Sequence, residues 1–253
     1  MKDSVDDKEG VGRTQKALNL NFFSVMAALL LLVALSGFAR TFFLRPFFGL
    51  DPLPPHLYFH GTVLTAWYLL FFTQACLIAT HRTKTHRKLG VAGAFVAISV
   101  VAASLLTVFM RDVELIDEYP NLAFGNISSL IGFALCFASA MVFRNRPVFH
   151  KRLMVIASIQ IAAPALDRMV REPPLYDIAE KVFFWFPGYP PVAFATFATL
   201  FLLLSVAAYD LYSERRVKLA TLWGIACVFI LGPALSAAVV LTGGWQNFVR
   251  AFG

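Results

Sequence analysis

The sequence predicts an all-α membrane protein, a polytopic bundle of seven transmembrane helices. Hydrophobic residues make up 58% of its 253 residues, aromatic residues 15%, and the mean hydropathy is +0.69. A soluble domain could not cover so much apolar surface with so few polar groups. A helix needs about 20 apolar residues to cross a hydrocarbon core of about 30 Å. The segments that meet or approach this length are residues 21–39, 57–80, 90–110, 122–143, 153–169, 191–212 and 219–241.

The first segment follows a polar stretch. Residues 1–20 carry four acidic side chains and few apolar groups, so we expect a disordered cytoplasmic tail ahead of a bundle that spans residues 21–245. A basic start and the apolar run Phe22–Leu35 also resemble a weak signal peptide. Because the polar stretch is long and acidic, we expect the segment to remain as the first helix.

Proline and aromatic residues mark the connections. The loop Arg40–His56 holds four prolines, which predict an extended connector. The fifth segment contains Pro164, whose ring cannot donate a hydrogen bond to the Gln160 carbonyl. The loop Arg171–Pro191 combines five prolines with an aromatic cluster. This loop is expected to lie in the outer headgroup layer or, alternatively, to cover an externally open cavity as a lid.

The distribution of basic residues predicts the orientation. Most Lys and Arg side chains fall in the N-terminal tail and in the turns near residues 82–88, 144–152 and 215–218. The positive-inside rule places these segments in the cytoplasm, which puts the N-terminus inside and the C-terminus outside a bacterial-type inner membrane. The net charge of +7 is therefore a topology signal, and nothing in it indicates nucleic-acid binding.

A histidine-basic motif occurs twice on this predicted cytoplasmic side. The chain has HRKLG at residues 86–90 and HKRLM at residues 150–154. Histidines at the same level of two helices are typical of bis-imidazole haem ligation, so His86 and His150 are candidate metal ligands for haem b. Arg87 and Arg152 are then candidates to hold its propionates. Alternatively, each histidine is hydrogen-bonded to a carbonyl or a lipid phosphate beside snorkelling basic side chains.

The two motifs divide the middle of the chain into similar halves. Residues 57–110 and 122–169 each cross the membrane, turn at a motif and return, so they are a possible hairpin repeat in one orientation. Functional groups often lie at the interface between such repeats.

Polar side chains also predict a second site, near the outer surface. His60, Trp67, Gln74 and His81 recur at steps of seven and share one helix face, which must contact protein or water. The predicted outer polar site consists of His56, His60, Gln74, Gln160, Asp167 and Arg168. The alternatives are ordinary interhelical hydrogen bonding and, for Asp167, a simple ion pair with Arg171 four residues on.

Other chemistry has no signature in this chain. The sequence holds no Ser/His/Asp, H-E-x-x-H, P-loop or GxGxxG arrangement. Cys76, Cys136 and Cys227 fall inside apolar segments without metal-ligand spacing, so they are expected to pack as small side chains.

The motifs resemble those of an uncharacterised group of bacterial multi-pass membrane proteins. That group pairs an HR-x-LG turn with a later H-K/R-x-x-M turn and an arginine near the end of the following helix, which matches residues 86–90, 150–154 and Arg168 here. More distantly, the histidines are similar to those of transmembrane cytochrome b-type electron carriers. This second resemblance implies at most one haem, on the cytoplasmic side, because a facing histidine for His60 is missing from the outer level.

Three functional hypotheses follow. The first is a haem-binding redox protein that uses His86 and His150 and exchanges electrons with a membrane partner. The second is a small-molecule transporter or sensor with an outward-facing polar site. The third is a non-catalytic assembly factor whose contacts are with the lipid bilayer and a membrane partner. The sequence alone leaves it uncertain whether the protein is an enzyme.

Overall fold

The computed structural model describes residues 21–110, 120–185 and 189–241, and within these ranges every regular element is a helix. Residues 1–20, expected to form a disordered tail, lie outside the described residues, as do residues 242–245 at the end of the predicted bundle. The helices are α1 Phe22–Gly37, α2 Pro55–Ala79, α3 Thr83–Phe109, α5 Pro120–Val142, α6 Pro147–Gln160, α7 Ala163–Met169, α8 Leu175–Val182, α9 Pro190–Glu214, α10 Leu219–Ala226 and α11 Gly232–Leu241.

Five helices of the described chain are long and apolar enough to cross a membrane. They are Pro55–Ala79, Thr83–Val108, Phe124–Val142, Pro190–Glu214 and Leu219–Ala238. The last of these joins α10 and α11 through a π-helical turn at Cys227–Leu231. This set is consistent with the predicted multi-pass membrane protein.

The other two predicted spans take a different form. The segment 21–39 gives α1, whose 16 residues are shorter than a full span. The segment 153–169 is broken into α6 and α7 by a turn at Ile161 and Ala162. The break follows from Pro164, which is placed in the first turn of α7, where a missing N–H costs nothing.

Both histidine-basic motifs lie on helices and not in the turns before them. Helix α3 begins at Thr83 and α6 begins at Pro147, so His86 and His150 stand in the first turns. His81 has a φ of 60°, the left-handed conformation that ends a helix, and the following Arg82 N–H donates to the Leu77 carbonyl at 2.7 Å. His81 therefore leaves the helix face on which the sequence pattern placed it.

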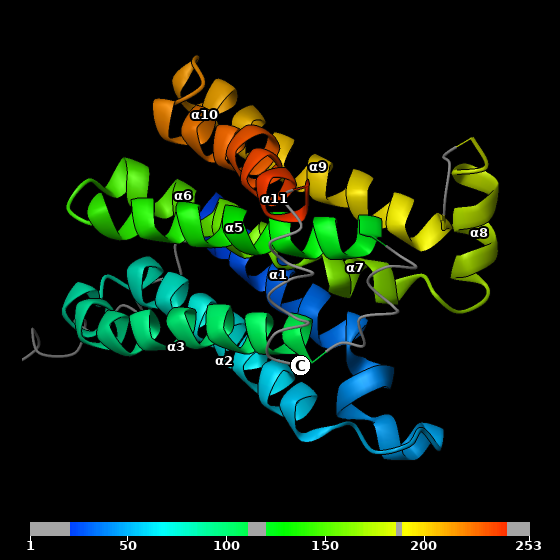
Figure 1. Cartoon of the computed structure of the whole chain (residues 1–253). Helices are drawn as coiled ribbons and strands as arrows, with labels where there is room; N and C mark the ends of the chain where they lie inside the picture. Colours follow the sequence, from blue (N-terminus) through cyan, green and yellow to red (C-terminus); the bar gives the residue numbers. More distant parts are fainter. Residues whose placement is uncertain (1–20, 111–119, 186–188, 242–253) are drawn as a thin grey trace, which may run out of the picture.

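Figure 1 shows the α2–α3 hairpin beside the α5–α6 hairpin, with α8 at the far end of α9. The turns α2–α3, α5–α6 and α9–α10 gather at one end, which we call the basic end (residues 82–88, 144–152 and 215–218). The start of α1 joins them, since the Lys151 ammonium lies 4.5 Å from the Phe23 ring centroid. We call the opposite end, which holds residues 38–54 and 163–171, the cavity end.

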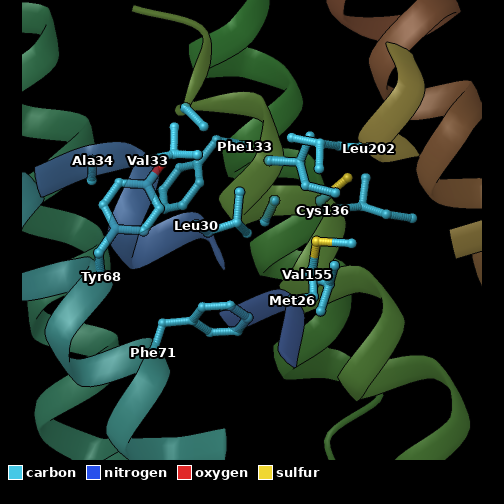
Figure 2. Packing of buried hydrophobic residues seen from close by; sticks show 14 of the residues in the cluster. Met26, Leu30, Val33, Ala34, Tyr68, Phe71, Phe133, Cys136, Val155 and Leu202 are labelled. Atoms are coloured by element: carbon cyan, nitrogen blue, oxygen red, sulfur yellow. The ribbon is translucent and has the colours of Figure 1, made fainter. Parts of the chain in front are cut away.

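Helix α6 is the centre of the bundle. Residues 152, 153 and 155–160 are all buried, so α6 from Arg152 onward is enclosed by α1, α5, α9 and α10. Figure 2 shows the surrounding core, in which Leu30 of α1, Phe71 of α2 and Phe133 of α5 converge. A cross-bond adds to it, because the buried Tyr68 hydroxyl of α2 donates to the Ser158 carbonyl of α6 at 2.9 Å.

A buried ion pair joins α6 to α9. Arg152 is 1% exposed and Asp210 is fully buried. The Asp210 Oδ1 accepts from Arg152 Nε at 2.8 Å and from Nη2 at 2.5 Å. Its Oδ2 accepts from the Lys218 N–H at 3.0 Å and the Thr221 hydroxyl at 2.6 Å, both next to or within α10. One carboxylate thus connects three helices.

We expect Asp210→Asn to lower the free energy of unfolding by up to about 3–5 kcal/mol, because the buried Arg152 guanidinium then keeps only the exposed Glu214 carboxylate, at 3.6 Å, as its counter-charge. Unfolding by SDS titration in mixed micelles, followed by circular dichroism, measures the change. The exposed Asp177→Asn in α8 is the matched control. Replacing both partners (Arg152→Met with Asp210→Leu) should recover most of the loss, since no unpaired charge remains. Equal effects of the two Asp→Asn changes would contradict this role.

Candidate functional site

A cavity of about 260 Å³ opens at the cavity end, between α1, α2, α7 and the π-helical turn Ala39–Phe43. Most of its wall is apolar, with Leu31 and Leu35 from α1 and Leu64 from α2. Among the described residues, its charged lining consists of three arginines, one of which, Arg171, is paired with Asp167. The polar groups of the lining are Thr41, Arg45, His60, Thr65, Tyr68, Arg168 and Arg171.

Two glycines allow the walls to come together. A Cβ atom on Gly61 of α2 would lie 2.4 Å from the Phe42 ring, and one on Gly37 would lie 2.2 Å from the Ala165 carbonyl oxygen. Only glycine permits these contacts, which bring Phe42 across α2 and seat the end of α1 on α7. The cavity is therefore shaped by close backbone approach.

Helix α7 positions the central cation. Arg168 Nη1 donates to the Pro164 carbonyl at 3.0 Å, and its guanidinium lies 4.9 Å from the Phe38 ring centroid. These contacts orient the guanidinium at the cavity wall, where it is within electrostatic range of the His60 ring on α2. Two helices from different hairpins thus present cationic or hydrogen-bonding groups to one space.

Two buried polar atoms of lining residues have no hydrogen-bond partner among the described residues. They are the buried Nδ1 of His60 and the buried Oγ1 of Thr41. Buried polar atoms are satisfied in most native structures, so each exception requires an explanation such as a bound water, an ion or local strain. Here both atoms belong to residues that line the cavity.

Asp167 takes the simpler of its two predicted roles. Both Arg171 Nε, at 2.8 Å, and Nη2 donate to the Asp167 Oδ2. The carboxylate therefore stands behind Arg171 and is not itself part of the cavity lining. Only Oδ2 of Asp167 takes part in this pair, and the buried Oδ1 accepts no hydrogen bond from a described residue.

The predicted outer polar site divides into separate places. His60 and Arg168 line the cavity, and His56 is near enough to affect the charge of His60 without lining it. Gln160 packs on α5, where its Nε2 would lie 2.6 Å from a Cβ atom on Gly132. Gln74 lies toward the basic end, with its Nε2 3.7 Å from the Cβ position of Gly90. Gln74 and Gln160 are therefore not brought to the cavity.

The loop expected as an anchor or a lid meets this cavity only at its first residue, Arg171, among the described residues. Helix α8 packs on α9, where the Phe183 and Phe197 rings stack with centroids 5.4 Å apart. No residue of α8 lines the cavity. Ile178 of α8 and the following Phe184 and Trp185 are exposed, an arrangement that suits a membrane interface.

The two histidines predicted as haem ligands come together at the basic end. The rings of His86 and His150 lie with their centroids 6.3 Å apart and their planes at 82°. The His150 Nδ1–H donates to the Ala140 carbonyl at 2.9 Å, which leaves Nε2 as the nitrogen with a lone pair. The His86 ring lies beside the backbone of Gln74, and its Nδ1 is buried without a partner.

The two arginines assigned to this site differ. Arg87 is exposed and near His86, so it remains able to contact an anionic group. Arg152 is instead occupied by Asp210, a residue that sequence analysis did not single out. An acid near the end of an otherwise apolar helix is a signal that could have identified it, because such a charge needs a buried partner.

No cluster of three or more His, Cys, Asp or Glu side chains in the described ranges could hold a metal ion. The sulfur atoms of Cys136 and Cys227 lie near each other in the apolar core as free thiols. Comparison with known proteins identifies no relative: no family model, no curated protein and no solved structure matches this chain.

Proposed function

We propose that this protein binds a small organic anion in the cavity and acts as a transporter or sensor for it. One observation supports this proposal above all others. Three arginines are among the described residues that line an otherwise apolar cavity. Guanidinium N–H groups are hydrogen-bond donors that suit the oxygens of an anion.

The chemistry of the lining suits a carboxylate or a phosphate. A guanidinium presents parallel N–H donors that match two oxygens of such a group, and the pairing strengthens when water is excluded. Arg168 is already oriented by Pro164 and Phe38, so little side-chain freedom is lost on binding. The apolar walls would exclude water from this contact.

Within this proposal the membrane topology is the one expected from the charges. Helix α1 and the broken pair α6–α7 supply two further crossings, for seven in total in an inner membrane. Seven crossings with the basic end in the cytoplasm put the N-terminus inside, the C-terminus outside and the cavity open to the outside. The Lys and Arg side chains of residues 82–88, 144–152 and 215–218 support this orientation.

Hexanoate is a suitable first probe, because it combines a carboxylate with a short apolar chain. We expect Arg168→Gln to weaken hexanoate binding about 10- to 100-fold, since a hydrogen bond to a charged group contributes about 1.5–3 kcal/mol. Isothermal titration calorimetry on the purified protein measures the change. The exposed Arg144→Gln at the basic end is the control. Unchanged affinity in the Arg168 variant, or no binding to the wild type, would refute the anion site.

We also propose a second candidate function, haem binding at the basic end, on one specific observation. His86 and His150 are 64 residues apart in sequence and come from different hairpins, yet their rings are neighbours. The hydrogen bond from His150 Nδ1–H to Ala140 is the kind of support that orients a metal-ligating histidine. A haem b held there would supply one-electron transfer to a membrane redox partner, with Arg87 near its propionates.

The visible spectrum tests this second candidate. A protein purified from haem-replete cells should show a Soret band that His86→Ala and His150→Ala each abolish, because both imidazoles are needed as axial ligands. His81→Ala, which changes an exposed histidine, should leave the band unchanged. A featureless spectrum would reject the redox function. If hexanoate also failed to bind, the third hypothesis, a non-catalytic assembly factor, would be favoured.

A further inference from the structure

We infer that His86 and His150 together bind a single copper(I) ion at the basic end, one ion per chain. This inference shares the histidine pair with the haem candidate and differs in the group that the pair binds. Three observations carry it: the ring nitrogen that each histidine leaves free, the distance between the two rings, and the charge of the residues around them.

Each of the two rings offers one nitrogen to a metal. The His150 Nδ1–H donates to the Ala140 carbonyl at 2.9 Å, so its Nε2 carries the lone pair. The His86 ring is in hydrogen-bonding contact with the backbone of Gln74, while its buried Nδ1 has no partner among the described residues. The contact with Gln74 therefore belongs to Nε2–H, and Nδ1 carries the lone pair of His86. A second nitrogen held by a carbonyl is the usual support of a metal-ligating histidine.

The distance between the rings matches two nitrogens on opposite sides of one ion. A metal–imidazole bond is about 2.0 Å long and a ring nitrogen lies about 1.2 Å from its centroid, so a straight line through the ion separates the centroids by about 6.4 Å. A tetrahedral angle at the ion would bring the centroids to about 5.2 Å. The observed separation is 6.3 Å, with the ring planes at 82°. The spacing therefore suits a near-linear site.

The number of ligands restricts the ion further. Structural zinc sites use four ligands, and calcium and magnesium use six or more. No third His, Cys, Asp or Glu side chain joins the pair within the described ranges. Copper is among the ions that imidazole suits, and its monovalent form has a filled d shell that two neutral nitrogens in a line satisfy. Copper(I) is therefore the ion that two opposed imidazoles fit best.

The charge of the surroundings also favours a monovalent ion. Residues 82–88 and 144–152 contain Lys and Arg but no Asp or Glu. Arg87 is near enough to act electrostatically on the His86 ring. The repulsion between these cations and a bound ion is proportional to the charge of the ion, so it is twice as large for a divalent ion. A single positive charge has the smaller cost in this environment.

The choice of nitrogen distinguishes a bare ion from haem. Nδ1 is adjacent to the ring carbon that carries Cβ, so a porphyrin bound at Nδ1 of His86 would meet the side chain of that histidine itself. A small ion has no such conflict. Both rings are partly exposed, unlike the fully buried Cys136 and Cys227, so an ion can reach the pair from outside the bundle.

The test titrates the full-length protein in nanodiscs with copper(I) under anaerobic conditions, in competition with the chelator bicinchoninate. We expect one ion per chain. His86→Ala and His150→Ala should each weaken binding about 100-fold or more, because one imidazole alone does not satisfy the ion. His81→Ala, which changes an exposed histidine of the α2–α3 turn, is the matched control and should leave the affinity unchanged. Equal affinities in the wild type and both site variants would overturn the inference.

X-ray absorption at the copper edge identifies the ligands. We expect the intense pre-edge feature of linear two-coordinate copper(I), with two nitrogen neighbours. The free thiols of Cys76, Cys136 and Cys227 are competing copper ligands, so a variant with alanine at all three positions should retain the ion. Sulfur neighbours in the wild type would overturn the site, and this result does not depend on whether the cysteine variant folds.

The visible spectrum of the same samples separates this inference from the haem candidate. A featureless spectrum together with copper(I) on the two histidines would retain the copper site and reject haem. A Soret band that both histidine variants abolish would place a porphyrin at the pair and overturn the copper site. A wild type that binds neither group would reject the two proposals together.

Discussion

The architecture depends on the buried pair between Arg152 and Asp210. Arg152 lies in the buried part of α6, so its charge is not solvated and must be neutralised by a neighbouring helix. Desolvation of two charges is offset only when the geometry is good and the remaining hydrogen-bonding positions are filled. Asp210 meets this condition because Lys218 N–H and the Thr221 hydroxyl occupy its second oxygen. The pair therefore sets the depth and rotation of α6 against α9 and α10.

The positions of both candidate sites depend on α6. His150 precedes Arg152 by two residues, so the depth of α6 brings its ring to His86 of the other hairpin. Toward the opposite end, the hydrogen bond from Tyr68 to Ser158 attaches α2 to α6. Beyond it, the break at Ile161–Ala162 reorients the chain, and α7 presents Arg168 to the wall that His60 shares. A straight helix through Pro164 would not place these groups in the same way.

Hydropathy was sufficient to locate the long helices, because burial in lipid leaves a continuous apolar run. Most predicted bounds lie within a few residues of the observed ones, but α3 begins at Thr83, seven residues before the predicted start. Hydropathy failed where a local backbone feature interrupts a helix inside or at the end of an apolar segment. Pro164 broke one predicted span, and His81 left the α2 face because the helix ends there. Periodicity identified the face shared by His60 and Gln74, but it does not give depth. Fourteen residues are about 21 Å of helix, so one end of that face reaches the cavity and the other reaches His86.

The pairing of Asp210 with Arg152 could not be predicted from the sequence, for a different reason. Its partner is 58 residues away, and no i±4 basic residue marks the acid as paired. The pairing depends on the packing of three helices, and only the position of α6 in the bundle shows that Arg152 pairs with Asp210.

The polar face of α2 raises a separate question, namely why these polar residues are present. His60, Trp67 and Gln74 each keep a buried polar atom without a protein partner, which costs about 1–3 kcal/mol apiece. Apolar side chains at these three positions would remove that cost. The presence of polar residues on a face that connects the two candidate sites therefore favours a role in binding over simple packing.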